Sequence, residues 1–266
     1  MSPMNNRRMT PTQEPGILDF APGAAAAYSL RNLSLAYTGP VVTVRRSTDD
    51  AEADFTASEV SDGTLAAWCG GGDGFVKQWW DQSGNTGRNG TQATAANQPQ
   101  VVASGVVVTE SGKPALDFSV SANASMSASV PITDINVFAV VSIDSYTLSP
   151  AICEFSKTGY RRILVTNNLG AFRFYLDGTD YLSAALFPAG RFVATYQHNA
   201  TAFSMRINGA TENESTVASP QTTDTLTIGN DLTLGNPMPA ISELLIYPTD
   251  MTALRTRIEG NLAWYY

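Results

Sequence analysis

The sequence predicts an all-β protein, an antiparallel β-sandwich with short helices near both ends. Short apolar and β-branched runs recur along the chain, and turn residues separate them at fairly regular intervals. Only 15% of the residues are charged, so much of the surface must consist of small polar residues, which suit strands and turns. A length of 266 residues is usual for one large all-β domain.

The N-terminal segment, residues 1–24, is polar and interrupted by prolines, so it cannot form a core of its own. We expect an extended arm that lies on a neighbouring subunit, followed by the sandwich domain over residues 25–266. Prolines favour such docking because they reduce the entropy that the segment loses when it becomes extended. The apolar side chains of the arm are the candidate assembly anchors, the last three of them at its junction with the sandwich: Met4, Met9, Ile17, Leu18 and Phe20.

Local patterns predict the elements of the domain in order. An alanine-rich run predicts a helix over about 24–36, and a second short helix is expected over 63–69. Asp250 can cap a C-terminal helix over 251–263 whose apolar face contains Leu254, Ile258 and Leu262. The predicted strands are 42–45, 75–80, 100–108, 115–118, 135–143, 151–155, 162–166, 172–176, 192–198, 202–207, 225–228 and 241–247.

Charge and composition exclude several functions. The formal net charge of −8 repels phosphate backbones, so we expect no nucleic-acid partner. No apolar run reaches the roughly 18–20 residues that span a bilayer, and residues 1–16 contain no apolar segment of a secretory signal. Cys69 and Cys153 are therefore expected to be free thiols. His198 is the single histidine and lacks metal-binding partners nearby in the sequence, so we expect neither a metal nor a cofactor.

Four sequence blocks occur in a specific order in the first half of the chain: Ala27–Arg31, Ala36–Pro40 running into Val44–Ser47, Trp80–Asn85 and Gly112–Ala115. Together they resemble the first part of the catalytic domain of the α-L-arabinofuranosidase B family, over residues 27–118. The resemblance implies a concanavalin A-like (laminin-G-like) sandwich, a jelly roll. The residues of the third block also predict its role without the family resemblance. Asp81, Ser83 and Asn85 can accept hydrogen bonds from the backbone of a tight turn at Gly84, so we expect this block to be structural.

The chain is also similar to bacteriophage virion and tail-associated proteins. This similarity implies a non-catalytic structural subunit, either a head decoration or cement protein or a tail-associated protein, assembled in the host cytoplasm. Its expected partners are other virion proteins and further copies of itself.

An arabinofuranosidase-type hydrolase is the first alternative. The family resemblance matches its acid/base residue to Asp231, in the turn Thr227–Asp231. The nearest equivalents of its nucleophilic glutamate are Asp177 and Asp180, whose side chains are shorter by one methylene, although catalytic geometry tolerates little error. The family's early disulfide would join Cys69 to the position of Gly74, and its adjacent cysteine pair is Ile152–Cys153 here. We therefore expect no glycosidase activity.

The second alternative is a carbohydrate-binding module with a cell-surface polysaccharide as its partner. Sugar rings stack on exposed aromatic side chains, although packing in the core is the competing explanation for each such residue. The candidate glycan-binding residues are Trp79, Trp80, Tyr175, Tyr181 and Asp231.

Overall fold

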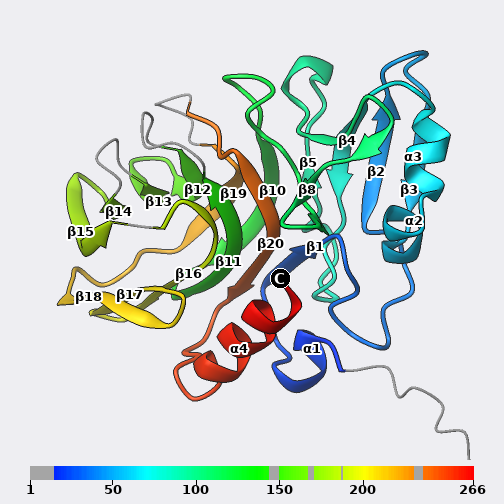
Figure 1. The fold of residues 1–266 in the computed structure, drawn as a ribbon. Coiled ribbons are helices and arrows are strands. Elements are labelled where there is room, and N and C mark those ends of the chain that lie inside the picture. The colour runs from blue at the N-terminus through cyan, green and yellow to red at the C-terminus, as the bar shows by residue number, and fades with distance from the viewer. Residues whose placement is uncertain (1–14, 144–149, 167–170, 187, 231–235) are drawn as a thin grey trace, which may run out of the picture.

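The computed structural model describes residues 15–143, 150–166, 171–186, 188–230 and 236–266, and these residues form three layers (Figure 1). Two antiparallel sheets face each other and enclose the main core. Helices α1 (Ile17–Phe20) and α4 (Arg255–Tyr265) pack on the outer face of the smaller sheet and enclose a second apolar cluster. The predicted all-β sandwich is confirmed.

The smaller sheet has the strand order β1-β20-β11-β16-β17-β18 in the described part of the chain. Its strands are β1 (Ala26–Ser29), β11 (Ile135–Ile143), β16 (Gly190–Asn199), β17 (Ala202–Ile207), β18 (Ala210–Thr216) and β20 (Ala240–Tyr247). The larger sheet covers one face of its central strands and the two helices cover the other. All nine residues of β11 and all eight of β20 are therefore buried, which explains their nearly continuous apolar sequences.

The larger sheet has the strand order β15-β14-β13-β12-β19-β10-β5-β4-β2-β3, with β6 and β7 extending from β4. Its strands are β2 (Val42–Arg46), β3 (Glu52–Phe55), β4 (Gly74–Trp79), β5 (Gly90–Thr91), β6 (Gln100–Ala103), β7 (Val106–Val107), β10 (Met126–Ile132), β12 (Ala151–Lys157), β13 (Tyr160–Thr166), β14 (Ala171–Leu176), β15 (Thr179–Leu186) and β19 (Thr223–Ile228). Strand β10 alternates strictly between buried and exposed residues. The outer face of the sheet therefore meets solvent at β10.

The small elements complete the fold. Helix α2 (Ala57–Ser61) begins with a capping box in which the Thr56 backbone N–H donates to Glu59 Oε2 at 2.8 Å. Helix α3 (Thr64–Cys69) confirms the helix predicted over 63–69, and the 3₁₀ turn η1 (Ala95–Asn97) and the hairpin β8 (Thr109–Glu110) and β9 (Lys113–Pro114) follow. None of the helices in the described residues is long and apolar enough to cross a membrane.

The helix predicted over 24–36 is wrong, because this segment forms strand β1. Ala26 lies opposite Ile246 and Ser29 opposite Glu243, so β1 pairs along one edge with β20. The alanines are buried rather than helical because both faces of this sheet are covered. The small side chains of the alanine run, residues 24–27, fit between two covering layers as well as they fit in a helix.

The other edge of β1 is closed by side chains and backbone of residues 81–88, a segment that we call the Asp81 clamp. The Ala27 N–H donates to Asp81 Oδ1 at 2.7 Å, and the Ala27 carbonyl accepts from the Gln82 N–H at 2.8 Å. Asn85 Nδ2 donates to the carbonyl of Ala24 at 3.0 Å, and Arg88 donates to that of Ala25. The predicted structural role of the Trp80–Asn85 block is confirmed. Its side chains bond within their own turn, as in the bond from the Ser83 N–H to Asp81 Oδ1, and also to β1 and the residues just before it.

Residues 15–24 pack on the sandwich of their own chain. Ile17 is fully buried beneath α4, and Leu18 and Phe20 pack around the same cluster, so these three residues do anchor the junction. Gly16 approaches the carbonyl of Leu33 so closely that a Cβ would lie 2.1 Å from its oxygen. The extended arm predicted for residues 1–24 therefore does not include 17–20. Met4 and Met9 lie outside the described residues.

Other sequence predictions need smaller corrections. The strand predicted over 100–108 is the hairpin of β6 and β7, which turns at Ser104 and Gly105 with positive φ. Residues 115–118 form only isolated bridges such as Leu116 with Ile241. Helix α4 begins at Arg255, because the Asp250 carboxylate caps the preceding turn through the Thr252 N–H at 2.9 Å. The strands that the sequence did not predict are β1, β3, β5, β10, β15 and β18, besides the two-residue β8 and β9.

Cys69 and Cys153 are both buried and free. Gly74 lies beside Cys69, and a Cβ built on it would be 2.9 Å from the Cys69 sulfur. This is the position that the family resemblance pairs with Cys69. The two backbones are therefore placed as a disulfide would place them, although only one cysteine is present.

We predict that Asp81→Ala lowers the free energy of unfolding by about 2–3 kcal/mol, because the buried Ala27 N–H loses its acceptor. Asp81→Asn keeps an acceptor oxygen, and burial raises the pKa of the Asp81 carboxyl, so the neutral amide should cost clearly less. Urea denaturation measures both changes. Equal losses for the two variants would contradict the clamp.

We predict that His198 titrates below 6.5, since burial lowers its pKa and the nearby Arg162 cation lowers it further. The unfolded chain binds this proton near pH 6.5 and the folded chain only at lower pH. The contribution of the neutral His198 to the free energy of unfolding is therefore fully present above pH 6.5. It should be lost as the pH falls through the pKa of His198 in the folded chain. Proton NMR of the single imidazole follows the titration, and His198→Gln should abolish this part of the pH dependence of unfolding.

Candidate functional site

The strand register places two rows of side chains, most of them polar, on the outer face of the larger sheet, where the first row is buried at β19, β12 and β13 and becomes exposed towards β15. In the first row Thr227, Glu154, Ile163, Tyr175 and Asp180 lie directly opposite one another across β19, β12, β13, β14 and β15. Residues directly opposite in antiparallel strands share a face, so all five project outward. Their neighbours along each strand, such as Phe155 and Phe174, point into the core.

Beside this row, Ser156 of β12 lies opposite Arg161 of β13. Arg161 reaches diagonally to Glu154, and its Nε and Nη2 donate to the two carboxylate oxygens at 2.7 Å each. Glu154 is buried although it lies on the outer face, whereas 29% of the Arg161 side chain is exposed. A bidentate pair of this kind fixes both side chains in one orientation.

A hollow of about 480 Å³ opens over this ion pair, which we call the outer-face hollow. Its walls are Glu154, Ser156, Lys157, Gly159, Tyr160, Arg161, Tyr175 and Asp177. The half-buried Tyr175 stands over the small apolar cluster of Ala151 and Ile163. The hollow thus combines two aromatic residues, the buried Tyr160 and the half-buried Tyr175, with charged and polar groups, of which Glu154 and Arg161 hold each other in place.

Asp177, the candidate nucleophile, is exposed in the two-residue turn between β14 and β15. Its φ of 42° and that of Gly178, 98°, are those of a tight hairpin turn that favours Asp followed by Gly. Its carboxylate makes no hydrogen bond within the described residues, so no neighbour fixes its orientation. Asp180, the second candidate, lies 3.6 Å from Arg173 Nε in a partly exposed ion pair.

Asp231, the candidate acid/base and glycan-binding residue, lies outside the described residues. The turn that leads to it is well fixed. Gly229 has a φ of 79°, and a Cβ there would lie 2.2 Å from the ring of Phe118, so only glycine fits. The buried Asn230 donates through Nδ2 to the carbonyl of Ala122 at 3.0 Å.

The structure separates the other candidate aromatic residues from this site. Trp79 is fully buried and packs against Tyr28, so its assignment as a glycan-binding residue is wrong. Trp80 is half-buried and donates through Nε1 to Thr43 Oγ1 at 3.0 Å. Tyr181 faces inward and contacts the rings of Phe174 and Phe203. Tyr175 and Asp177 are the predicted residues that the fold brings together.

Sequence reasoning missed Glu154 and Arg161. Glu154 alternates with Cys153 and Phe155 in a correctly predicted strand, and a charged residue between two core positions marks the open face of that strand. Its pairing with Arg161 depends on the hairpin register, which this alternation alone does not give. Among the described residues, no group of His, Cys, Asp and Glu side chains could hold a metal ion.

No protein-family model matches the sequence, and no curated protein matches it. Solved structures are similar in fold. A GH54 α-L-arabinofuranosidase soaked with a cyclic sulfate inhibitor aligns with a TM-score of 0.67 at 15% identity, over 89% of this chain and 62% of the enzyme. An arabinofuranosidase complexed with arabinofuranosyl-alpha-1,2-xylobiose aligns with a TM-score of 0.66, also at 15% identity and with the same coverage.

The sialidase of Trypanosoma rangeli in complex with the inhibitor DANA aligns less well, with a TM-score of 0.49 at 12% identity, over 68% of this chain and 30% of the sialidase. This chain spans about 62% of the length of the arabinofuranosidase structures. At this identity the likeness is one of fold, and it confirms the sandwich that the family resemblance implied.

Proposed function

We propose that this chain binds a saccharide in the outer-face hollow and does not hydrolyse it. The observation that carries the proposal is Tyr175, which stands on an open sheet face beside the fixed pair of Glu154 and Arg161. An aromatic ring offers an apolar surface to the C–H face of a sugar. A carboxylate next to the ring can accept hydrogen bonds from the sugar hydroxyls, and a guanidinium can donate hydrogen bonds to them.

The hollow has the properties of a prepared binding site. Its volume lies within the roughly 300–1,000 Å³ that is usual for small-molecule sites. Because Glu154 and Arg161 hold each other, little side-chain freedom remains to be lost when a ligand binds. The rigid sheet also holds Tyr175 and Arg161 on neighbouring strands, whereas a loop would allow them to separate.

We propose that the chain does not hydrolyse the saccharide because of how the carboxylates at the hollow are arranged. Retaining glycosidases need a nucleophile and an acid/base about 5 Å apart, each with a defined orientation. Both oxygens of Glu154 are engaged by Arg161, and the exposed carboxylate of Asp177 has no described neighbour that orients it. Neither residue is arranged as a nucleophile would be.

Pentose-containing oligosaccharides are the first ligands to test, because one similar structure contains arabinofuranosyl-alpha-1,2-xylobiose. A cell-surface polysaccharide that contains such units would be the natural partner. The virion subunit and its assembly partners stay predictions from the sequence resemblance, since no described contact supports or contradicts them.

We predict that Tyr175→Ala weakens binding of arabinofuranosyl-xylobiose about tenfold, because stacking on a ring contributes about 0.5–1.5 kcal/mol. Tyr175→Phe keeps the ring and should retain most of the affinity. Isothermal titration calorimetry measures the dissociation constants, and Leu186→Ala, on the exposed edge strand β15, is the matched control. Unchanged affinity of Tyr175→Ala would refute this site.

We predict that the chain releases no aglycone from an aryl α-L-arabinofuranoside above a buffer control. The measurement is a chromogenic assay with long incubation, run in parallel on Glu154→Gln and Asp177→Asn. Turnover that either substitution abolishes would establish the hydrolase instead, and would identify which carboxylate acts.

A further inference from the structure

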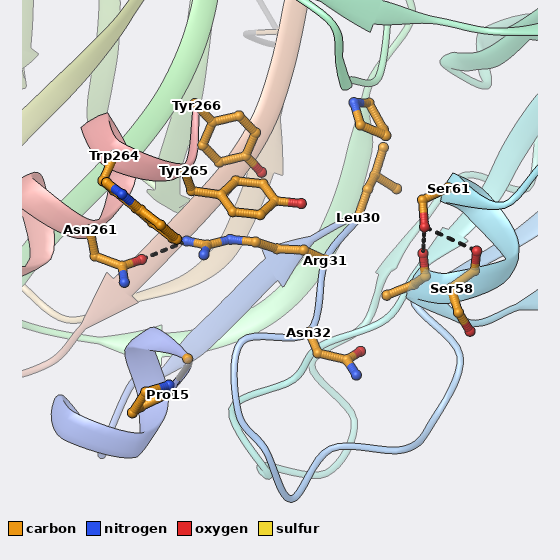
Figure 2. Close-up of a pocket in the computed structure, with 13 residues that line it drawn as sticks. Pro15, Leu30, Arg31, Asn32, Ser58, Ser61, Asn261, Trp264, Tyr265 and Tyr266 are labelled. Carbon is orange, nitrogen blue, oxygen red and sulfur yellow. Dashed lines mark hydrogen bonds between the residues drawn. The ribbon is translucent and has the colours of Figure 1, made fainter. Parts of the chain in front are cut away.

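A second cavity, of about 420 Å³, lies between the end of α4, helix α2 and the segment after β1 (Figure 2). We call it the Trp264 pocket. Its lining residues are Pro15, Gly16, Leu30, Arg31, Asn32, Ala57, Ser58, Ser61, Pro114, Asn261, Trp264, Tyr265 and Tyr266. Trp264 is 72% exposed, the largest exposed apolar side chain in the described residues.

The guanidinium of Arg31 is held rigidly at the wall of this pocket. Its Nε and Nη2 donate to the buried carboxylate of Glu243 at 2.8 and 3.0 Å, and Nη2 also donates to Asn261 Oδ1 at 2.9 Å. The ring of Tyr265 lies over it, with 4.1 Å between the guanidinium carbon and the ring centroid. Burial alone would lower the pKa of Arg31, but the Glu243 carboxylate outweighs that effect and raises it.

Glu243 is in turn fixed by two hydroxyl groups. Ser29 Oγ donates to Oε2 at 2.9 Å, and the Tyr266 hydroxyl donates to the same oxygen at 3.1 Å. The carboxylate therefore lies within a complete set of donors, and its charge balances that of Arg31. The end of α4 is tied to β1 and β20 by this cluster, so the aromatic residues at its end have a defined place.

Several polar groups at the pocket are nevertheless unused. Within the described part of the chain, Arg31 Nη1, Asn261 Nδ2 and the Tyr265 hydroxyl make no hydrogen bond, and neither does the side-chain amide of Asn32. Figure 2 shows Arg31, Asn261, Trp264 and Tyr265 side by side at one wall of the pocket. Arg31 Nη1 and Asn261 Nδ2 are donors on side chains that other hydrogen bonds hold in place, next to the exposed ring of Trp264.

We infer that the Trp264 pocket is a second binding site, and that it takes an uncharged saccharide. Trp264 offers the stacking surface, and the planar groups of Arg31 and Asn261 donate to neighbouring hydroxyls of one sugar ring. Arg31 is the single charged residue among the described lining residues, and Glu243 balances it. Lys113 lies 4.1 Å from the centroid of the Tyr265 ring but does not line the pocket, so the lining itself offers a charged ligand no unpaired charge.

This inference goes beyond the proposed function, because the two sites share no residue. The outer-face hollow lies on the open face of the larger sheet, whereas the Trp264 pocket lies at the β1 edge of the smaller sheet. Two separate subsites on one rigid domain could bind two parts of one polysaccharide, or two chains of it.

The experiment is a titration of the ¹⁵N-labelled full chain, observed at the indole N–H signals of its four tryptophans. Trp264→Ala assigns the Trp264 signal by its loss. The probes are methyl β-D-xylopyranoside, methyl α-D-glucopyranoside, methyl β-D-galactopyranoside and methyl α-D-glucuronide, each at millimolar concentration. We expect at least one of the three uncharged glycosides to shift the Trp264 signal, and to do so more strongly than the glucuronide.

Calorimetry with the glycoside that shifts the signal then measures the contribution of each residue. Trp264→Ala should weaken binding about tenfold or more, and Tyr265→Phe about threefold, since it removes one donor and keeps the ring. Leu35→Ala, at another exposed apolar residue outside the pocket, should leave the affinity unchanged.

Three results would overturn the inference: no shift of the Trp264 signal with any uncharged glycoside, a clear preference for the glucuronide, or unchanged affinity of Trp264→Ala. Tyr175→Ala separates this site from the outer-face hollow, since it should leave the Trp264 titration unaltered. If Tyr175→Ala abolished the Trp264 response, the two sites would not be independent.

Discussion

The hydrogen bonds between β1 and the Asp81 clamp are the contact on which the rest of the fold depends. Strand β1 has one neighbouring strand, β20, and its other edge would expose unpaired backbone groups. Asp81 and Asn85 satisfy those groups with side chains, and Gln82 continues the contact to the backbone N–H of Leu33 at 2.9 Å. Since β1 lies in the smaller sheet and residues 81–88 follow β4 of the larger one, the clamp also joins the two sheets.

The same segment determines where ligands can reach the molecule. Once β1 is fixed, Arg31 and Ser29 stand opposite Glu243, and this cluster ties the end of α4 to the smaller sheet. With α1, helix α4 then covers the outer face of that sheet. The outer face of the larger sheet remains open, so its outward row becomes the candidate binding surface, and the uncovered end of α4 leaves Trp264 at the surface.

Both proposed sites use a buried or half-buried ion pair to hold an aromatic residue and its polar neighbours in place. Arg161 and Glu154 stand beside Tyr175, and Arg31 and Glu243 support Tyr265. Breaking such a pair leaves a desolvated charge, so each pair resists movement of its partners. Rigid polar groups next to an exposed ring suit the recognition of sugars, which have many hydroxyls and little charge.

The fold class, most strands of the sandwich core and the structural role of the Trp80–Asn85 block could be predicted from the residues, because strand periodicity and turn residues are local signals. The remaining features depend on contacts between elements. Residues 26–29 are a strand because β20 and the Asp81 clamp occupy their two edges, although the alanine run over residues 24–27 favours a helix locally. The polar strand β18 forms because β17 pairs with it. Trp79 is buried against Tyr28, which is far away in the chain. Glu154 meets Arg161 through the register of the β12–β13 hairpin, which the alternation of residues in one strand does not specify.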